Sequence, residues 1–219
     1  MKIKNTLDDI IAEKFKDSLI VGSYHMGDTI LVNELVEKYG VSRTPVMQAL
    51  AKLSTQGILE KSASGKFCLP VYTQKNIDDI CEARIMFEKT AIKEIFASKE
   101  KRLEVLEKLR VYEKCCVDAL AGQDYLEFSK QDLNFHRSMI EAMDNEVITS
   151  LYYNVQGKFI IANYLAFPLM ERKFEKTIQE HERLLDELEK GTLEETEETI
   201  RAHIYQVTEI IRKLRLLEK

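Results

Sequence analysis

Apolar residues recur every three to four positions along most of the 219-residue chain, which is the spacing of amphipathic helices. Up to residue 72 the helical stretches are short, and glycines or turn residues separate them. The pattern there predicts helices over 5–21, 31–39 and 42–56, followed by a short β-hairpin over 58–69. This order of elements predicts a small N-terminal domain, residues 1–72, of the winged helix-turn-helix type.

From residue 76 onward the helical period continues to the end of the chain, and no strand pattern interrupts it. The predicted helices cover residues 76–97, 100–121, 124–143, 145–165, 169–190 and 193–217. Short connections between helices of this length favour antiparallel neighbours. We therefore predict a mostly α protein, in which an all-α antiparallel bundle over 76–219 follows the N-terminal domain.

Composition limits the classes of protein to which the chain can belong. A hydrophobic content of 45% with 32% charged residues is typical of a folded globular protein, not of a disordered one. No apolar run approaches the roughly 18 residues that span a bilayer, and the first residues lack the apolar region of a signal peptide. The four cysteines lack metal or redox spacing and favour reduced thiols. We expect a cytoplasmic protein with no membrane partner.

The net charge of −5 is unevenly distributed along the chain. Residues 1–74 carry a net charge of +1, and residues 75–219 carry −6. A weakly basic N-terminal domain beside an acidic bundle permits contact with nucleic acid through the N-terminal domain alone.

The stretch YGVSRTPVMQAL, residues 39–50, begins its helix with a polar and basic first turn. Ser42 is predicted as the N-cap, and Val46 and Leu50 belong to the buried face. The residues predicted to contact DNA, on the outward face and at the hairpin tip, are Ser42, Arg43, Thr44, Met47, Gln48, Lys52, Gly65 and Lys66. Amide, hydroxyl and basic groups at a helix start suit phosphates and base edges in a major groove. A helical unit that contacts protein is the alternative.

The segment GVSRTPVMQALAKLSTQGIL, with G-x-x-x-x-G-D over 22–28 upstream, resembles the GntR family of bacterial transcription regulators over residues 1–70. The resemblance implies a homodimer that binds a palindromic operator of double-stranded DNA, with this helix in the major groove. Two positions depart from the family pattern, which usually has arginine where Met47 stands and glutamate where Gln48 stands. Since that arginine often reads a base, the operator sequence does not carry over from the family.

Three of the four histidines lie in the bundle, each in phase with an apolar helix stripe. Asp132 and His136 share one helix face, while His181 and His203 lie on two later helices. Burying a carboxylate and three imidazoles without partners costs on the order of several kcal/mol. A divalent cation would satisfy all four side chains, and Zn²⁺ or Ni²⁺ suits this donor set best, with Fe²⁺ or Mn²⁺ as alternatives. Ordinary hydrogen-bonded core histidines remain the other interpretation.

The order D-x-x-x-H, then E-H, then a last histidine resembles the FCD ligand-binding domain of one GntR subfamily, over about 76–217. In that family these four positions hold a metal at the floor of a small-molecule cavity. The resemblance further implies that Arg84 anchors the carboxylate of a small organic acid effector. A structural ion pair with Glu88, at i+4, is the alternative role for Arg84. Asn134 and Asn163 are weaker candidates for polar residues of the cavity wall.

The sequence therefore favours a ligand-responsive transcription regulator over an enzyme. No further acid or base stands beside the predicted metal ligands, and an enzyme has no need of a DNA-binding domain. Two alternatives stay open from the residues alone. In one, the cation itself is the signal; in the other, a metal with open positions activates water for hydrolysis or supports oxygen chemistry.

Overall fold

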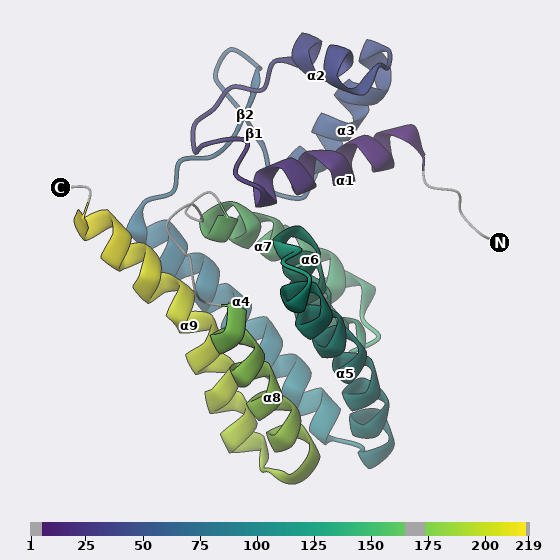
Figure 1. The fold of residues 1–219 in the computed structure, drawn as a ribbon, viewed down its shortest axis with the longest axis vertical. Helices are drawn as coiled ribbons and strands as arrows, with labels where there is room; N and C mark the ends of the chain where they lie inside the picture. Colours follow the sequence, from purple (N-terminus) through teal and green to yellow (C-terminus); the bar gives the residue numbers. More distant parts are fainter. Residues whose placement is uncertain (1–5, 165–173, 218–219) are drawn as a thin grey trace.

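The computed structural model of the chain describes residues 6–164 and 174–217. The N-terminal unit contains α1 (Leu7–Ile20), α2 (Val32–Tyr39), α3 (Arg43–Thr55), β1 (Glu60–Lys61) and β2 (Phe67–Cys68). The helices that follow are α4 (Gln74–Phe96), α5 (Lys99–Ala121), α6 (Tyr125–Glu141), α7 (Glu146–Tyr164), α8 (Phe174–Lys190) and α9 (Leu193–Leu217). In Figure 1 the N-terminal unit lies at one end of a bundle built from these six helices.

The turn between α2 and α3 follows from its residues. Gly40 ends α2 in the left-handed conformation, with φ 63°, which glycine adopts without steric cost. Ser42 then precedes α3 in an extended conformation, as predicted for the N-cap, although its hydroxyl makes no capping hydrogen bond. The helix buries Val46, Leu50 and Leu53 completely against the rest of the unit. Its polar face is thereby directed outward.

The wing is a shorter hairpin than the sequence predicted. Its strands pair antiparallel over two residues each, with Glu60 opposite Cys68. Ile58 and Leu59 do not join the sheet, because their amides both donate to the carbonyl of Leu53 at the end of α3. The second strand is also fastened on its other side, where the Ile30 amide donates to the carbonyl of Phe67 over 2.8 Å. The helices and wing together form a winged helix-turn-helix.

The bundle helices bury their apolar stripes against one another. Helix α4 begins at a capping box, in which the Thr73 hydroxyl accepts from the Asn76 amide over 3.2 Å. It packs on α7 and α9, while α5 packs on α6 and α8. The predicted helix over 169–190 begins at Phe174 within the described residues, because 165–173 lie outside them. The prediction of an all-α bundle is confirmed.

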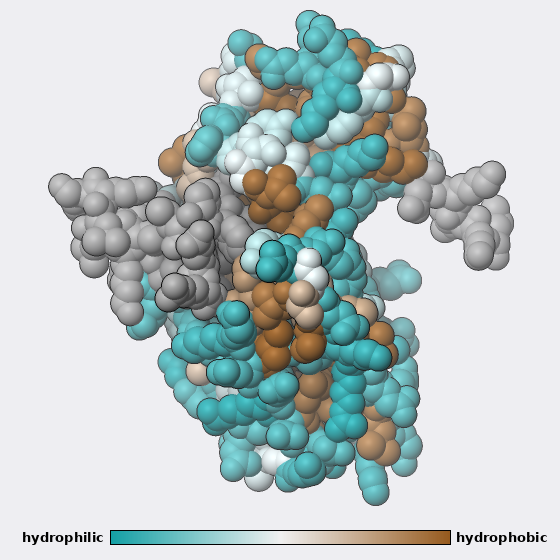
Figure 2. Space-filling model, viewed as in Figure 1, coloured by the Kyte–Doolittle hydropathy of each residue, from teal (hydrophilic) through white to brown (hydrophobic). Residues whose placement is uncertain are grey.

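One hydrophobic core continues from the N-terminal unit into the bundle, through buried residues such as Leu59, Tyr72 and Ile77. Helices α6 and α7 contact α1 at this junction, as Figure 1 shows. Hydrophilic residues cover most of the bundle face drawn in Figure 2, with apolar residues between the helices. Among the described helices, none is both long and apolar enough to cross a membrane.

Candidate metal centre and DNA-contacting surface

The four side chains predicted as metal ligands converge in the middle of the bundle. Asp132 and His136 extend from α6, His181 from α8 and His203 from α9. One oxygen or nitrogen atom from each of the four lies within 4.8 Å of the others. His136 and His181 are almost completely buried, and the side chains of Asp132 and His203 are 13% and 12% exposed. The structure therefore brings together all four residues from three helices that are separated in the sequence.

Each imidazole of this cluster also contacts a glutamate through its Nδ1 atom. The Nδ1 atoms of His136 and Glu88 Oε2, and of His181 and Glu113 Oε2, are 2.7 Å apart. His203 Nδ1 lies 2.9 Å from Oε2 of Glu180. The expectation that the imidazoles lack protein partners is therefore wrong. Glutamates that hold the outer nitrogen of a histidine are the usual second layer of a metal site.

These contacts fix which nitrogen of each ring faces the centre. A carboxylate only accepts, so each Nδ1 carries the proton, and each Nε2 of a neutral ring presents a lone pair. His136 Nε2 and His203 Nε2 are 3.1 Å apart, and Oδ1 of Asp132 lies 3.5 Å from Nε2 of His181. His181 Nε2 is buried and has no hydrogen-bond partner. Lone pairs that face one another repel, and a cation between them removes the repulsion. The donor set therefore fits a divalent metal ion.

The charges around the cluster favour the neutral form of His136. Burial, together with the positive charge of Arg84, lowers the pKa of His136 to about 4. Although burial alone would raise it, the Arg84 charge holds the pKa of Glu88 well below its usual value. At neutral pH, Glu88 is consequently ionised and His136 is a neutral ring available as a ligand.

Arg84 lies on α4 beside this network and is itself buried. Its Nε donates to Oε1 of Glu88 over 2.6 Å, so the i+4 ion pair is present. The Tyr152 hydroxyl donates to the same oxygen over 2.8 Å, and the guanidinium lies 4.1 Å from the centre of the Phe159 ring. Arg84 is thus held by α7 as well as α4, at the edge of the cluster.

Of the two predicted asparagines, the structure describes the side chain of Asn134 only. Asn134 is half-buried, and it lies between Asp132 and His136 on α6, two residues from each. At about 100° per residue, its side chain leaves the helix on the side away from those two ligands. Asn163 lies in α7, but its side chain is outside the described residues. The structure therefore does not group Asn134 with the cluster, and the role of Asn163 stays a prediction.

Glu113 and Glu180 are not predicted from the sequence, and Glu88 is predicted only as a partner of Arg84. Glu113 shares a buried face of α5 with Leu106, Leu109 and Cys116, so its phase carried the same signal that identified the histidines. Glu180 immediately precedes His181 and is half-buried. Nothing in its phase along α8 marks it as a partner of His203, because that pairing depends on how α8 and α9 pack.

On the N-terminal unit, the residues of α3 that are predicted to contact DNA form one exposed surface. The side chains of Ser42, Arg43, Thr44, Met47, Gln48 and Lys52 are all exposed. Asn33 on α2 accepts a hydrogen bond from Arg43 over 2.8 Å, which orients the guanidinium. Lys52 forms an ion pair with Asp9 on α1. The Lys52 ammonium group is therefore already paired with a carboxylate of the same chain. Thr44, Met47 and Gln48 occupy the centre of the outward face.

The hairpin tip carries the other two residues predicted to contact DNA, Gly65 and Lys66. Gly65 has φ 77° and closes a turn in which its amide donates to the carbonyl of Ser62 over 2.8 Å. The next residue, Lys66, is exposed, and its carbonyl accepts from the Ser62 amide. The tight turn thus holds a basic side chain at the tip of the wing.

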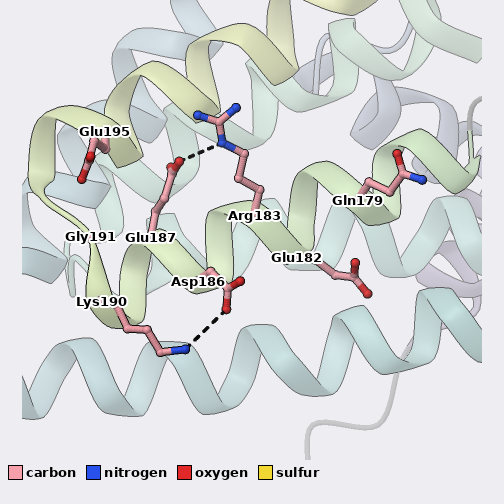
Figure 3. Close-up of a pocket in the computed structure, with 8 residues that line it drawn as sticks. All are labelled: Gln179, Glu182, Arg183, Asp186, Glu187, Lys190, Gly191 and Glu195. Atoms are coloured by element: carbon pink, nitrogen blue, oxygen red, sulfur yellow. Dashed lines mark hydrogen bonds and ion pairs between the residues drawn. The ribbon is translucent and has the colours of Figure 1, made fainter.

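A separate hollow of ≈ 620 Å³ lies on the surface beside α8 and the start of α9. Figure 3 shows that charged side chains line it, with Arg183 bonded to Glu187 over 2.8 Å and Lys190 3.9 Å from Asp186. These exposed i, i+4 pairs are typical of a solvated helix face. None of the predicted site residues belongs to the lining of this hollow.

Comparison with family models supports both parts of the chain. A model described as bacterial regulatory proteins, gntR family, matches residues 7–65, and a model of the FCD domain matches residues 79–206. These ranges fall inside the two predicted domains, 1–72 and 76–219, whose boundary itself stays a prediction.

Individual relatives agree with these matches. The HTH-type transcriptional regulator YdhC of Bacillus subtilis is 25% identical over 87% of this chain and 84% of its own length. The gluconate operon transcriptional repressor of Bacillus subtilis is 26% identical over 80% of this chain and 70% of its own length. The solved structure of E. coli McbR/YncC has a TM-score of 0.80 at 16% identity, over 96% of this chain and 99% of that one. The last comparison establishes a shared fold.

Proposed function

Because this chain belongs to the gntR family of bacterial regulatory proteins, in the branch with an FCD domain, we propose that a small ligand in its bundle controls its binding to DNA. The ligand is a small organic acid, bound next to a divalent metal ion. The facing Nε2 atoms of His136 and His203, 3.1 Å apart, are the observation that carries this proposal.

Asp132, His136, His181 and His203 would hold the ion, while Glu88, Glu113 and Glu180 orient the three imidazoles. When bound, the ion supplies a positive centre to which a carboxylate is attracted. Arg84 adds a second fixed positive charge beside Asp132 and His136. A small acid held between the cluster and Arg84 would contact the metal ion at one end and the Arg84 guanidinium at the other.

The DNA partner is a palindromic duplex bound by a homodimer, with α3 of each protomer in a major groove. The exposed face of α3 supports this proposal, since Thr44, Met47 and Gln48 lie at its centre. Gln48 offers the donor and acceptor pair that matches adenine, and the apolar Met47 side chain suits a thymine methyl group. An acid that shifts the separation of the two α3 helices would change operator affinity.

Native mass spectrometry of the purified protein tests the metal and the acid together. We expect a dimer with one divalent ion per chain and a co-purified mass in the range of a small carboxylate. Adding the identified acid should then change the affinity for a duplex selected from a random-sequence pool. A metal-free dimer that binds no added Zn²⁺ or Ni²⁺ would contradict the proposal.

The second candidate is a regulator for which the metal ion itself is the signal. The contact between Arg84 and Glu88 favours it, because that guanidinium is already neutralised by a protein carboxylate. The two candidates differ in their response to the acid. If the metal is the signal, Zn²⁺ and EDTA account for the whole change in operator affinity; otherwise adding the acid to the metal-loaded protein changes operator affinity further.

Replacing Arg43 with alanine should lower operator affinity by about 1–3 kcal/mol, since it removes a cation at the start of the recognition helix. If the contact is to phosphate, the slope of log K against log salt also falls by about one. Fluorescence anisotropy over a series of salt concentrations measures both quantities. The matched control is Arg110→Ala, which removes an exposed arginine from α5 and should leave operator affinity unchanged. Equal affinities for the two variants would exclude Arg43 from the interface.

A further inference from the structure

Helix α7 contacts the C-terminal end of the recognition helix α3 through three polar or small residues. The Asn154 side chain donates from Nδ2 to the carbonyl of Thr55 over 2.9 Å, and so satisfies a carbonyl at the end of α3. Gly157 lies so close to the C-cap residue that a Cβ there would stand 2.2 Å from the Gln56 carbonyl oxygen. Only a glycine permits this approach between the two backbones.

The residues that follow α3 also lie close to α7. Gly57 adopts φ 71°, and a Cβ on it would lie 2.9 Å from Oδ1 of Asn154 and 3.1 Å from Cε of Lys158. The Ile58 amide then returns to the carbonyl of Leu53 over 3.0 Å. The end of α3 is therefore held between its own cap and α7.

The other side of α7 contacts the metal-holding network. Tyr152 donates to Glu88, and the ring of Phe159 lies against the Arg84 guanidinium. The buried Gln156 donates from Nε2 to the carbonyl of Leu133 over 2.8 Å, on the helix that carries Asp132.

Helical geometry places these two sets of contacts on opposite sides of α7. Positions 152, 156 and 159 cluster on one side at about 100° per residue, while 154, 157 and 158 cluster roughly 180° away. A shift of α7 toward or away from the network therefore moves the surface on which the end of α3 rests. Packed helices transmit such shifts as rigid bodies.

We propose that α7 transmits the state of the metal-holding network to the recognition helix, and that Asn154 and Gly157 are the positioning residues through which it does so. This inference rests on the proposed function, because it assumes that the network binds a metal ion. Neither residue is among the metal ligands, so their replacement should leave metal binding intact.

The test compares wild type with Asn154→Asp and Gly157→Ala, each with Zn²⁺ alone and with EDTA. Asn154→Asp keeps the side-chain shape but loses the N–H that Thr55 needs. Gly157→Ala adds the one methyl group that the contact excludes. The measurements are Zn²⁺ stoichiometry, affinity for the selected duplex, and hydrogen exchange of the amides over 53–58.

In wild type we expect Zn²⁺ to change operator affinity by at least about fivefold and to change exchange over 53–58. In both variants, bound Zn²⁺ should stay at one ion per chain, while its effect on operator affinity falls to within about twofold of none. Ser150→Ala, an exposed change on the same helix, should behave as wild type. Asn154→Gln, which restores an amide, should recover part of the effect.

The outcomes separate this inference from the proposed function. A wild-type protein that binds no Zn²⁺ refutes the metal site and the inference with it. A wild type that binds Zn²⁺ without any change in operator affinity or exchange refutes the inference alone. So do variants that retain the full wild-type effect of Zn²⁺. If Gly157→Ala does not fold, Asn154→Asp decides the question.

Discussion

Replacing His136 or His203 with alanine is expected to remove most of the bound metal and to lower thermal stability. Each change takes away one nitrogen of the pair that faces across 3.1 Å. Loss of an outer partner alone typically costs about 10–100-fold in metal affinity, so loss of a ligand should cost more. Metal at 100 times its Kd stabilises a fold by about 2.7 kcal/mol, and the variants forfeit that stabilisation. Elemental analysis and melting curves with and without EDTA measure both effects.

The fourth histidine provides the control for this experiment. His25 lies in the N-terminal unit, and its side chain is 82% exposed. His25→Ala should keep both the full metal content and the EDTA-dependent change in melting temperature. If His136→Ala and His203→Ala also keep them, the three imidazoles are ordinary core residues.

The second large effect is expected at Glu88, because this side chain joins three buried partners. Oε1 accepts from Arg84 and Tyr152, and Oε2 contacts His136. Removing one member of a buried ion pair leaves an uncompensated charge and costs about 3–5 kcal/mol. Glu88→Ala should therefore lower the free energy of unfolding by that amount. Urea denaturation in EDTA measures it without a contribution from bound metal.

Two further variants test whether the stability lost in Glu88→Ala comes from the unpaired charge of Arg84. Glu82→Ala, an exposed change on the same helix, should alter stability by no more than about 0.5 kcal/mol. The double variant Arg84→Met, Glu88→Leu removes both charges and should be less destabilised than Glu88→Ala alone. A Glu88→Ala protein as stable as Glu82→Ala would show that Arg84 finds another counter-charge.

Much of the fold could be predicted from the sequence because two signals agree along the chain. The spacing of apolar residues predicts helices, and the glycines and capping residues mark the same helix ends. Gly40 and the Ser42 N-cap position marked the recognition turn, and the structure places the helix ends within a residue of them. The predicted hairpin is too long because the apolar pair Ile58 and Leu59 stands directly before Glu60 and Lys61 and resembles the start of a strand. Their amides instead complete the end of α3, and a pattern of side chains does not report backbone hydrogen bonds.

For the site, helical phase predicted that Asp132, His136, His181 and His203 face the bundle interior, and the structure brings these four side chains together. The glutamates behind them were harder to find. Glu113 was one of several acids on α5, and its inward phase was overlooked; Glu180 meets His203 only through the packing of α8 on α9. The Asn154 and Gly157 contacts had no sequence signal at all, since they join residues about 100 positions apart.

The four predicted ligands differ in their exposure to solvent, so one side of the cluster is more accessible than the other. His136 and His181 are closed off by surrounding side chains, whereas Asp132 and His203 each retain a little contact with solvent. Among the four side chains, Asp132 and His203 are therefore the ones that an incoming ion would meet first. If the cluster holds a metal ion, the ion would enter on this side of the cluster.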